Sequence, residues 1–399
     1  MKSAELTAGY VQADDVADPA YSEMIHAKTR AEYQTYIHDY VITRLDMLNR
    51  FWYNAFRDGR LFEAAISVAK QIPLSTYLAF DIGVRFRSYL LGRSGVSSKL
   101  THIPDVEKLA PGVVRILGKN PSRMTLRGTN TYLLGEGPRR ILIDSSDGNA
   151  RYIENLRRVC ASHGVDEITD LVITHGHTDH IGGVLHVREM FPRIKMWKFM
   201  PPGGGDRKLR HSNAECEALL IQPLRHGHSF DIPGMTNTVL RTEYMPGHCA
   251  DHTCFLLEDK TASTVALFSG DCILGEGSCM FDSLGDLMKS LQRLRSLAPY
   301  VIYPAHGPVV EKAAAKIEEY ITHRQQREEE IVQVLQSATK PLTSKELVSV
   351  IYKKLPFLLS LAARSALEKH LDKLVFERRV QKKEPTAWLG KPTYVWLSA

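Results

Sequence analysis

The chain is 399 residues long and carries a formal net charge of +6, from 51 lysines and arginines against 45 aspartates and glutamates. Hydrophobic residues make up 44% of the chain and charged residues 24%, ordinary fractions that exclude a disordered, collagen-like or membrane-embedded protein. The mild positive charge permits contact with nucleic acid or with an acidic carrier protein, but it requires neither.

The early sequence and the use of cysteine indicate where the protein works. Residues 1–5 lead into an acidic stretch, so neither a secretory nor an arginine-rich transit signal is visible. The apolar run 74–91 contains an aspartate and two arginines, which argues against a membrane span. The cysteines form no CxxC pair, as expected in a reduced, intracellular compartment. We therefore predict a soluble, cytoplasmic protein with no membrane partner.

Residues 1–100 are predicted to form a helical N-terminal extension. Apolar and aromatic residues recur there at spacings of three and four between positions 21 and 91, and Gly92-Arg93-Ser94-Gly95 is typical of a linker. A lid, a dimer arm, a carrier-docking surface and simple packing against the rest of the protein all remain open for this extension.

The pattern changes to short strands punctuated by glycine in residues 101–312, which we expect to form the second domain. Strands are predicted at residues 113–117, 131–134 and 140–144, a helix at 149–163, and a return to strand at 230–244. From residue 313 to about residue 376 the pattern is typical of helices, and residues 379–397 are predicted to form a terminal β-hairpin. Helices followed by a hairpin resemble a winged-helix module, so residues 313–399 are the third predicted domain.

One stretch, THGHTDHIGG at residues 174–183, points to a metal site. It follows the apolar run 171–173, and a strand ending there places His175 and His177 on one side of the backbone. Asp179 and His180 then fall in the turn that opens a helix. Imidazole and carboxylate ligands suit zinc, and suit iron or manganese with less preference.

Three further ligand candidates each follow a strand-like run. His248, Asp271 and His306 lie at these strand ends, each beside a glycine that lets the backbone approach a metal closely. Ligands at the ends of several strands share one rim of a sheet, where open α/β architectures place their sites.

These motifs together resemble the metallo-β-lactamase superfamily, and more closely its β-lactamase-like protein subfamily of polyketide-associated acyl-carrier-protein thioesterases and mitochondrial-type endoribonucleases. The resemblance covers about residue 113 to the C-terminus, and nothing before residue 100 contributes to it. It rests on HGHTDH at 175–180, PGH at 246–248, SGD at 269–271 and PAHG at 304–307, and on the subfamily-like stretches 120–121, 128–133, 270–275 and 303–308.

The resemblance implies an αββα sandwich with two Zn²⁺ ions that hold a hydroxide between them. It assigns Asp179 a catalytic role as a proton carrier as well as a metal ligand. The implied ligands are His175, His177 and His248 for the first metal, Asp179, His180 and His306 for the second, and Asp271 as a bridge.

Residues near the ligands receive supporting assignments. Asp144 matches the position whose carboxylate orients the site without binding metal. His252 is expected behind the ligands, and Cys249 is expected to pack rather than to act as a nucleophile. The sequence departs from the subfamily at residues 144–148, DSSDG in place of Asp-Thr-Gly, and at Gly176, where a bulky aromatic is usual. Gly176 would leave room over the metals for a wide substrate.

We therefore expect a dinuclear zinc hydrolase that releases a polyketide or acyl chain from an acyl carrier protein, with that carrier or a polyketide synthase as its partner. The alternative is an endoribonuclease specific for single strands, in which the basic pairs 353–354, 378–379 and 382–383 grip phosphates. In a third reading the metals are structural and the tail is a binding module, but seven ligand positions around an open site argue against it.

Overall fold

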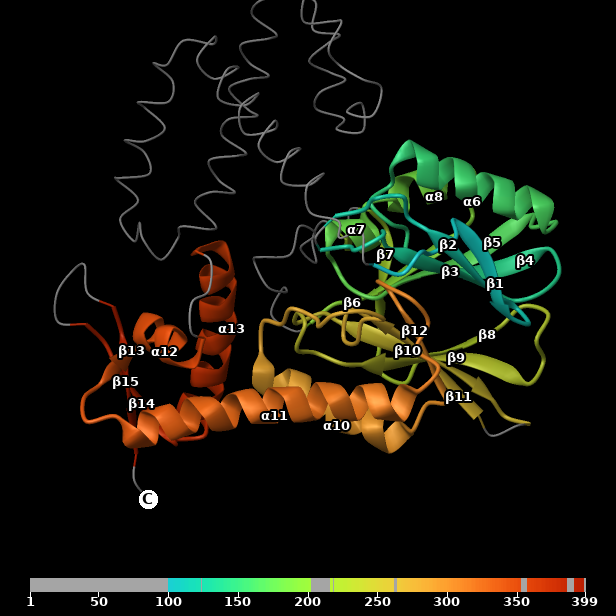
Figure 1. The fold of residues 1–399 in the computed structure, drawn as a ribbon. Coiled ribbons are helices and arrows are strands. Elements are labelled where there is room, and N and C mark those ends of the chain that lie inside the picture. Colours follow the sequence, from blue (N-terminus) through green and yellow to red (C-terminus); the bar gives the residue numbers. More distant parts are fainter. Residues whose placement is uncertain are drawn as a thin grey trace, which may run out of the picture. The chain divides into compact units, whose positions relative to one another are not determined.

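The structure is a computed structural model that describes residues 100–397 apart from 123, 202–215, 218, 262–263, 353–356 and 386–390. The predicted helical extension, but for Leu100, lies outside the described residues, as does the basic pair Lys353 and Lys354. The described residues belong to one compact unit, residues 98–399 (Figure 1).

The first sheet has seven strands whose spatial order follows the chain. Its first four strands pair antiparallel, and β4 to β7 pair parallel. The strands are β1 (Val106–Ala110), β2 (Val113–Leu117), β3 (Asn130–Leu134), β4 (Arg139–Ile143), β5 (Glu167–Ile173), β6 (Lys195–Phe199) and β7 (Ile221–Leu224). Three helices accompany this half of the chain: α6 (Ala150–Ser162), α7 (Thr178–Ile181) and α8 (Val184–Met190).

The second sheet has five strands in the order β12-β11-β10-β9-β8. These strands are β8 (Ser229–Asp231), β9 (Thr238–Tyr244), β10 (Thr253–Asp259), β11 (Thr264–Gly270) and β12 (Val301–Pro304). Its outer face is covered by α10 (Leu284–Leu297) and by the first half of α11 (Ala313–Ser337), which Figure 1 shows on the side away from the first sheet.

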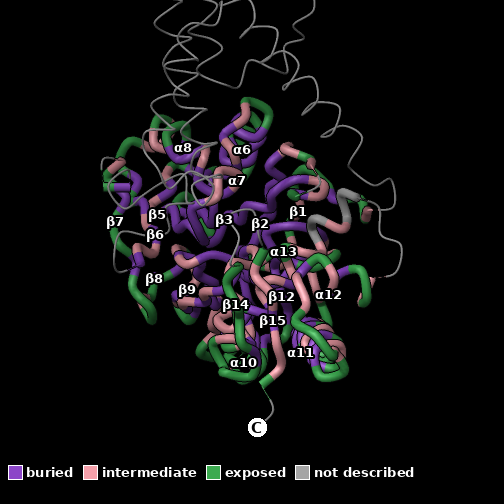
Figure 2. The backbone as a smooth tube through the Cα atoms, turned by 90° about the vertical axis from the view of Figure 1, so that its left-hand side faces the viewer, coloured by how far each residue is buried: buried purple, intermediate pink, exposed green. Residues whose placement is uncertain are grey.

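Alternation of side chains along the strands produces the layers. Leu142 of β4 packs with α6 in an outer core, whereas its neighbours Ile141 and Ile143 face the second sheet. Phe268 of β11 faces inward in the same way, and its ring lies 5.0 Å from that of Tyr132 on β3. Figure 2 shows the buried positions concentrated in the strands and the exposed positions on the outward faces of the helices. The predicted αββα sandwich is therefore confirmed.

The C-terminal part is a small helical module with a three-stranded sheet. It comprises the end of α11, β13 (Leu342–Thr343), α12 (Ser344–Ile351), α13 (Phe357–Phe376), β14 (Val380–Lys383) and β15 (Thr393–Trp396). Thr343 and Glu346 form a capping box at the start of α12, which satisfies free backbone donors there. The predicted terminal hairpin is confirmed, since β14 and β15 pair antiparallel. The predicted helical run to residue 376 is interrupted by β13, which pairs with β15.

None of the helices within the described ranges combines the length and the apolar character needed to cross a bilayer.

Candidate metal centre

All seven predicted ligands lie at one rim, at the ends of strands from both sheets. β5 ends at Ile173, and the turn that follows carries His175 and His177 into the short helix α7. The other candidates follow β9, β11 and β12. Gly247 is essential to this arrangement: a Cβ there would lie 2.4 Å from the backbone of Leu287 in α10.

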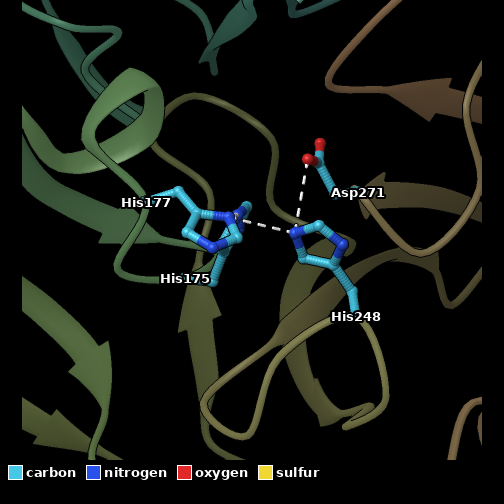
Figure 3. A group of neighbouring side chains, drawn as sticks. All are labelled: His175, His177, His248 and Asp271. Carbon is cyan, nitrogen blue, oxygen red and sulfur yellow. Dashed lines mark hydrogen bonds and ion pairs between the residues drawn. The ribbon is translucent and has the colours of Figure 1, made fainter. Parts of the chain in front are cut away.

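Four of the side chains form a first group (Figure 3). Nδ1 of His177 lies 2.8 Å from Nε2 of His175 and 3.1 Å from Nε2 of His248. Oδ2 of Asp271 lies 3.5 Å from the same His248 nitrogen. Three imidazole nitrogens and one carboxylate oxygen thus converge from four different positions of the chain.

The second group consists of Asp179, His180 and His306. Oδ2 of Asp179 lies 3.2 Å from Nε2 of His180 and 3.3 Å from Nε2 of His306. Oδ1 of Asp271 lies 3.2 Å from the same His306 nitrogen and 3.5 Å from His180. The two oxygens of Asp271 therefore face different groups, the arrangement expected of a bridging carboxylate.

The donor atoms fit a metal ion. Within each group the potential ligand atoms lie within 4.8 Å of one another. Nε2 of His180 and Oδ1 of Asp271 are buried and have no hydrogen-bond partner among the described residues. Each lies 3.2 to 3.5 Å from a neighbouring carboxylate or imidazole without forming a hydrogen bond, so these two atoms fit a cation that nitrogen and oxygen ligands would hold.

Partners behind the ligands fix the orientation of the imidazoles. Nδ1 of His180 lies 2.8 Å from Oδ2 of Asp144, a fully buried carboxylate, as the predicted orienting role requires. Nδ1 of His248 lies 2.7 Å from the carbonyl of Met280. In both rings this contact leaves Nε2 facing the site. Asp144 was identifiable from the sequence, whereas the Met280 carbonyl has no side-chain signature.

His252 and Cys249 occupy the places expected for them behind the ligands. Nε2 of His252 accepts the backbone N–H of Asp271 at 3.0 Å, so its Nδ1 carries the proton and donates to Met245 O at 3.1 Å. Burial lowers the pKa of His252 to about 3 and keeps the ring neutral. Cys249 is buried, and burial raises the pKa of its thiol well above the ordinary value, which disfavours a nucleophilic thiolate.

The two groups differ in their electrostatics. Burial lowers the pKa of His175 and of His177, and neighbouring imidazoles lower both further. Burial also acts to lower the pKa of His180, but nearby carboxylates, first that of Asp179, raise it well above the ordinary range. Burial acts to raise the pKa of Asp179, but His180 holds it well below the usual value. His175 and His177 thus present neutral imidazoles, the form that binds metal.

Three residues close to the ligands escape sequence reasoning. Thr129 lies with its Oγ1 3.3 Å from Oδ2 of Asp179. Asp251 accepts the N–H of Gly176 at 2.9 Å and pairs with Lys198. Lys198 shares a face of β6 with the buried Met196, but no strand is predicted there, so the sequence offers no signal for it.

Two family models match the chain. Residues 124–306 match the metallo-β-lactamase superfamily, and residues 343–388 match the β-lactamase associated winged helix domain. The second match agrees with the winged-helix-like module predicted from the C-terminal pattern.

Curated relatives cover most of the described chain. A β-lactamase-like protein 2 homolog from Caenorhabditis elegans is 38% identical over 73% of this chain and 94% of its own length. The homolog from Drosophila melanogaster is 40% identical over 70% of this chain and 93% of its own length. An atrochrysone carboxyl ACP thioesterase from Aspergillus fumigatus is 34% identical over 68% of this chain and 82% of its own length.

Solved structures support the fold. A β-lactamase domain protein from Burkholderia ambifaria superposes with a TM-score of 0.59 at 21% identity, covering 75% of this chain and 96% of that one. A metallo-β-lactamase family protein from Thermus thermophilus superposes with a TM-score of 0.54 at 22% identity, covering 73% of this chain and 100% of that one. With the sandwich and the His/Asp cluster at its rim, these matches show that the chain belongs to the metallo-β-lactamase superfamily and, within it, to the β-lactamase-like protein subfamily.

Proposed function

We propose that the chain is a dinuclear zinc hydrolase that cleaves the thioester joining an acyl or polyketide chain to an acyl carrier protein. The assignment as a hydrolase is supported mainly by the two His/Asp groups, which face the two oxygens of Asp271. His175, His177 and His248 would hold one ion, Asp179, His180 and His306 the other, and Asp271 would contact both. We further propose that residues 101–312 carry this chemistry, that residues 1–100 form a separate domain, and that residues 313–399 form a winged-helix-like domain that shares the helix α11 with the sandwich core.

When bound, the metal ions would polarise the thioester carbonyl and make water acidic enough to react at neutral pH. The chain's own contribution to proton transfer is assigned to Oδ1 of Asp179, since Oδ2 faces His180 and His306 as the ligand atom. This side chain is 26% exposed, so it is accessible from the open side of the centre. It would accept a proton from the attacking water and return it to the sulfur of the departing thiolate as the C–S bond breaks, so that the carrier leaves as its thiol and the acyl chain as the acid. Thr129 Oγ1, at 3.3 Å, would hold this carboxylate in place.

The preference for a thioester over RNA is supported by charge beside the centre. A cleft of 690 Å³ lies between the start of α10 and the helices α11 and α13, and its wall residue Asp282 donates its N–H to the carbonyl of His248 at 3.1 Å. A polyanion that followed this cleft would meet more negative than positive side chains. The charged lining residues are Asp282, Asp286, Glu328, Asp372 and Glu377 against Lys289, Arg324, Lys369 and Lys373.

Two of the six basic residues named for the nuclease alternative support the same choice. Arg379 lies 3.3 Å from Glu328, and Lys382 lies 3.1 Å from Glu384, so these cations are already paired with carboxylates. The fungal relative named as a thioesterase supports an acyl carrier protein as the partner. All six cysteines are free thiols, in keeping with the proposed cytoplasmic location. A gene position beside a polyketide synthase that lacks its own releasing domain would add further support.

Two measurements test the proposal. Elemental analysis of protein purified without chelator should find about two metal equivalents per chain, chiefly zinc, and fewer in His175→Ala. The full chain should release thiol from an acyl-carrier-protein thioester and from an N-acetylcysteamine thioester, and His306→Ala should be nearly inactive. His163→Ala, which removes an exposed histidine outside the centre, serves as the matched control and should retain activity.

The nuclease alternative makes an opposite prediction. RNA binding through phosphate contacts weakens steeply with salt, whereas hydrolysis of the small N-acetylcysteamine thioester depends little on it. Rapid cleavage of single-stranded RNA that collapses between low and moderate salt, with no thioester turnover, would refute the thioesterase. Folded, active protein that contains no metal would refute the hydrolase mechanism altogether.

A further inference from the structure

A fully buried ion pair lies directly beneath the first metal group. Lys198 on β6 is 1% exposed, Asp251 in the turn between β9 and β10 is 0% exposed, and Nζ lies 2.5 Å from Oδ2. Burial acts to raise the pKa of the Asp251 carboxyl, but Lys198 lowers it below the ordinary value and keeps it ionised. Because two charges lose their hydration here, such a pair contributes little net stability to the fold. Its role is better explained by the groups that the carboxylate contacts.

Asp251 connects the two loops that carry the histidines of the first group. Its Oδ2 accepts the N–H of Gly176 at 2.9 Å, and Gly176 separates His175 from His177. In its own turn Asp251 follows His248 by three residues, and its charge acts on the buried thiol of Cys249, the residue after His248. One carboxylate therefore contacts the backbone between His175 and His177 and lies in the same turn as His248, without itself belonging to the group.

Lys198 is fixed relative to the same loop by the sheet. β6 pairs parallel with β5, and Lys198 is in register with Ile173, two residues before His175. Its Nζ also donates to the carbonyl of Phe199 at 3.1 Å. The ammonium group is thus held at the strand end from which the ligand loop departs.

We propose that Lys198 and Asp251 are positioning residues that preorganise His175, His177 and His248 for a metal ion. The inference rests on the proposed metal centre but assigns a role to two residues outside it. A carboxylate is required because its negative charge compensates the buried ammonium of Lys198, while the same Oδ2 accepts the N–H of Gly176. Without Lys198 that charge would be buried and uncompensated, and the turn at Gly176 would lose its fixed position.

The test is metal affinity, measured on the full chain by competition for zinc with a chromophoric chelator. Lys198→Met and Asp251→Asn should each weaken the binding of one zinc equivalent by about 10- to 100-fold, the usual effect on metal affinity of removing a partner behind a ligand. The double variant should lose no more than the worse single variant, because both act through one contact. Lys195→Met, an exposed lysine on the same strand, and Asp231→Asn, an exposed carboxylate on β8, are the matched controls.

Cobalt-substituted protein gives a second readout, since its visible spectrum reports ligand geometry independently of turnover. Both single variants should alter that spectrum, and the controls should not. If Lys198→Met does not fold, Lys198→Arg keeps the charge but not the shape and should show the same loss to a smaller degree. Folded single variants with zinc affinity within twofold of the parent would overturn the positioning role. A parent protein that binds no zinc would overturn the metal centre itself, and the role with it.

Discussion

Replacement of Asp144 by asparagine should weaken metal binding by changing the tautomer of one ligand. Oδ2 of Asp144 accepts from Nδ1 of His180 at 2.8 Å and from Oγ1 of Thr174 at 2.8 Å, while Oδ1 accepts the N–H of Thr174 at 2.8 Å. Both carboxylate oxygens are therefore acceptors only. An amide NH₂ at the Oδ2 position would face Nδ1–H of His180, so the ring would have to carry its proton on Nε2 instead.

A proton on Nε2 removes the lone pair that would bind the metal. Loss of a partner behind a ligand costs about 10- to 100-fold in metal affinity, which corresponds to about 1.4 to 2.7 kcal/mol. The substitution itself should be well tolerated by the backbone. Asp144 has a φ of 59°, and asparagine is one of the few residues that adopts this left-handed conformation as readily as aspartate.

The assay is zinc competition on folded protein, with Asp231→Asn as the exposed carboxylate control. Circular dichroism of the metal-free proteins should show the same fold for parent and variant, because the shape of residue 144 is preserved. Asp144→Asn with zinc affinity within twofold of the parent would refute the argument that this carboxylate selects the tautomer of His180.

The other predictions concern proton transfer, the C-terminal helices and acid stability. Asp179→Asn keeps one ligand oxygen but removes the basic group, so turnover should fall by about 10²-fold or more with little change in KM; survival within tenfold in metal-replete protein would contradict it. Arg324→Lys should lower the free energy of unfolding, measured in urea, by about 1 to 3 kcal/mol. Lysine cannot reproduce the hydrogen bonds that the guanidinium donates to Ser278 Oγ at 2.5 Å and to Cys279 O at 3.0 Å. His370 is buried, and burial lowers its pKa from 6.5 to about 3, so its contribution to stability is present above pH 6.5 and is lost as the pH falls toward 3. His370→Leu should therefore lose less thermal stability than the parent between pH 7 and pH 5, and equal losses would refute this.

Much of the fold was predictable because its signals are local. The apolar runs at residues 113–117 and 140–144 coincide with β2 and, within one residue, with β4. Asn149 was placed at the start of the first long helix, and it caps α6 by accepting the N–H of Tyr152. β6 was harder to predict, because Lys198 is a charged residue at a buried position and breaks the alternation that identifies a half-buried strand.

The candidate ligands were predictable because each is a chemically distinctive side chain beside a strand end. Most of the contacts that hold these ligands in place could not be predicted from the sequence. The Met280 carbonyl that orients His248 is a backbone atom, and every residue has one. The contact of Asp251 with Gly176 joins positions 75 residues apart and arises only when the two sheets face each other. Such contacts depend on tertiary packing, which single-sequence patterns do not encode.

The helix α11 belongs to two hydrophobic cores at once. Ile317 and Tyr320 near its start pack beneath the second sheet, whereas Ile331 and Leu335 near its end pack with α12, α13 and β15. The two matched family regions, 124–306 and 343–388, thus meet through a rigid element rather than a linker. Cleavage of the chain within α11 would leave both cores open to water. Denaturation should accordingly proceed as one cooperative transition across the sandwich and the terminal module, so that neither can be expressed as an independent domain by cutting inside residues 313–337.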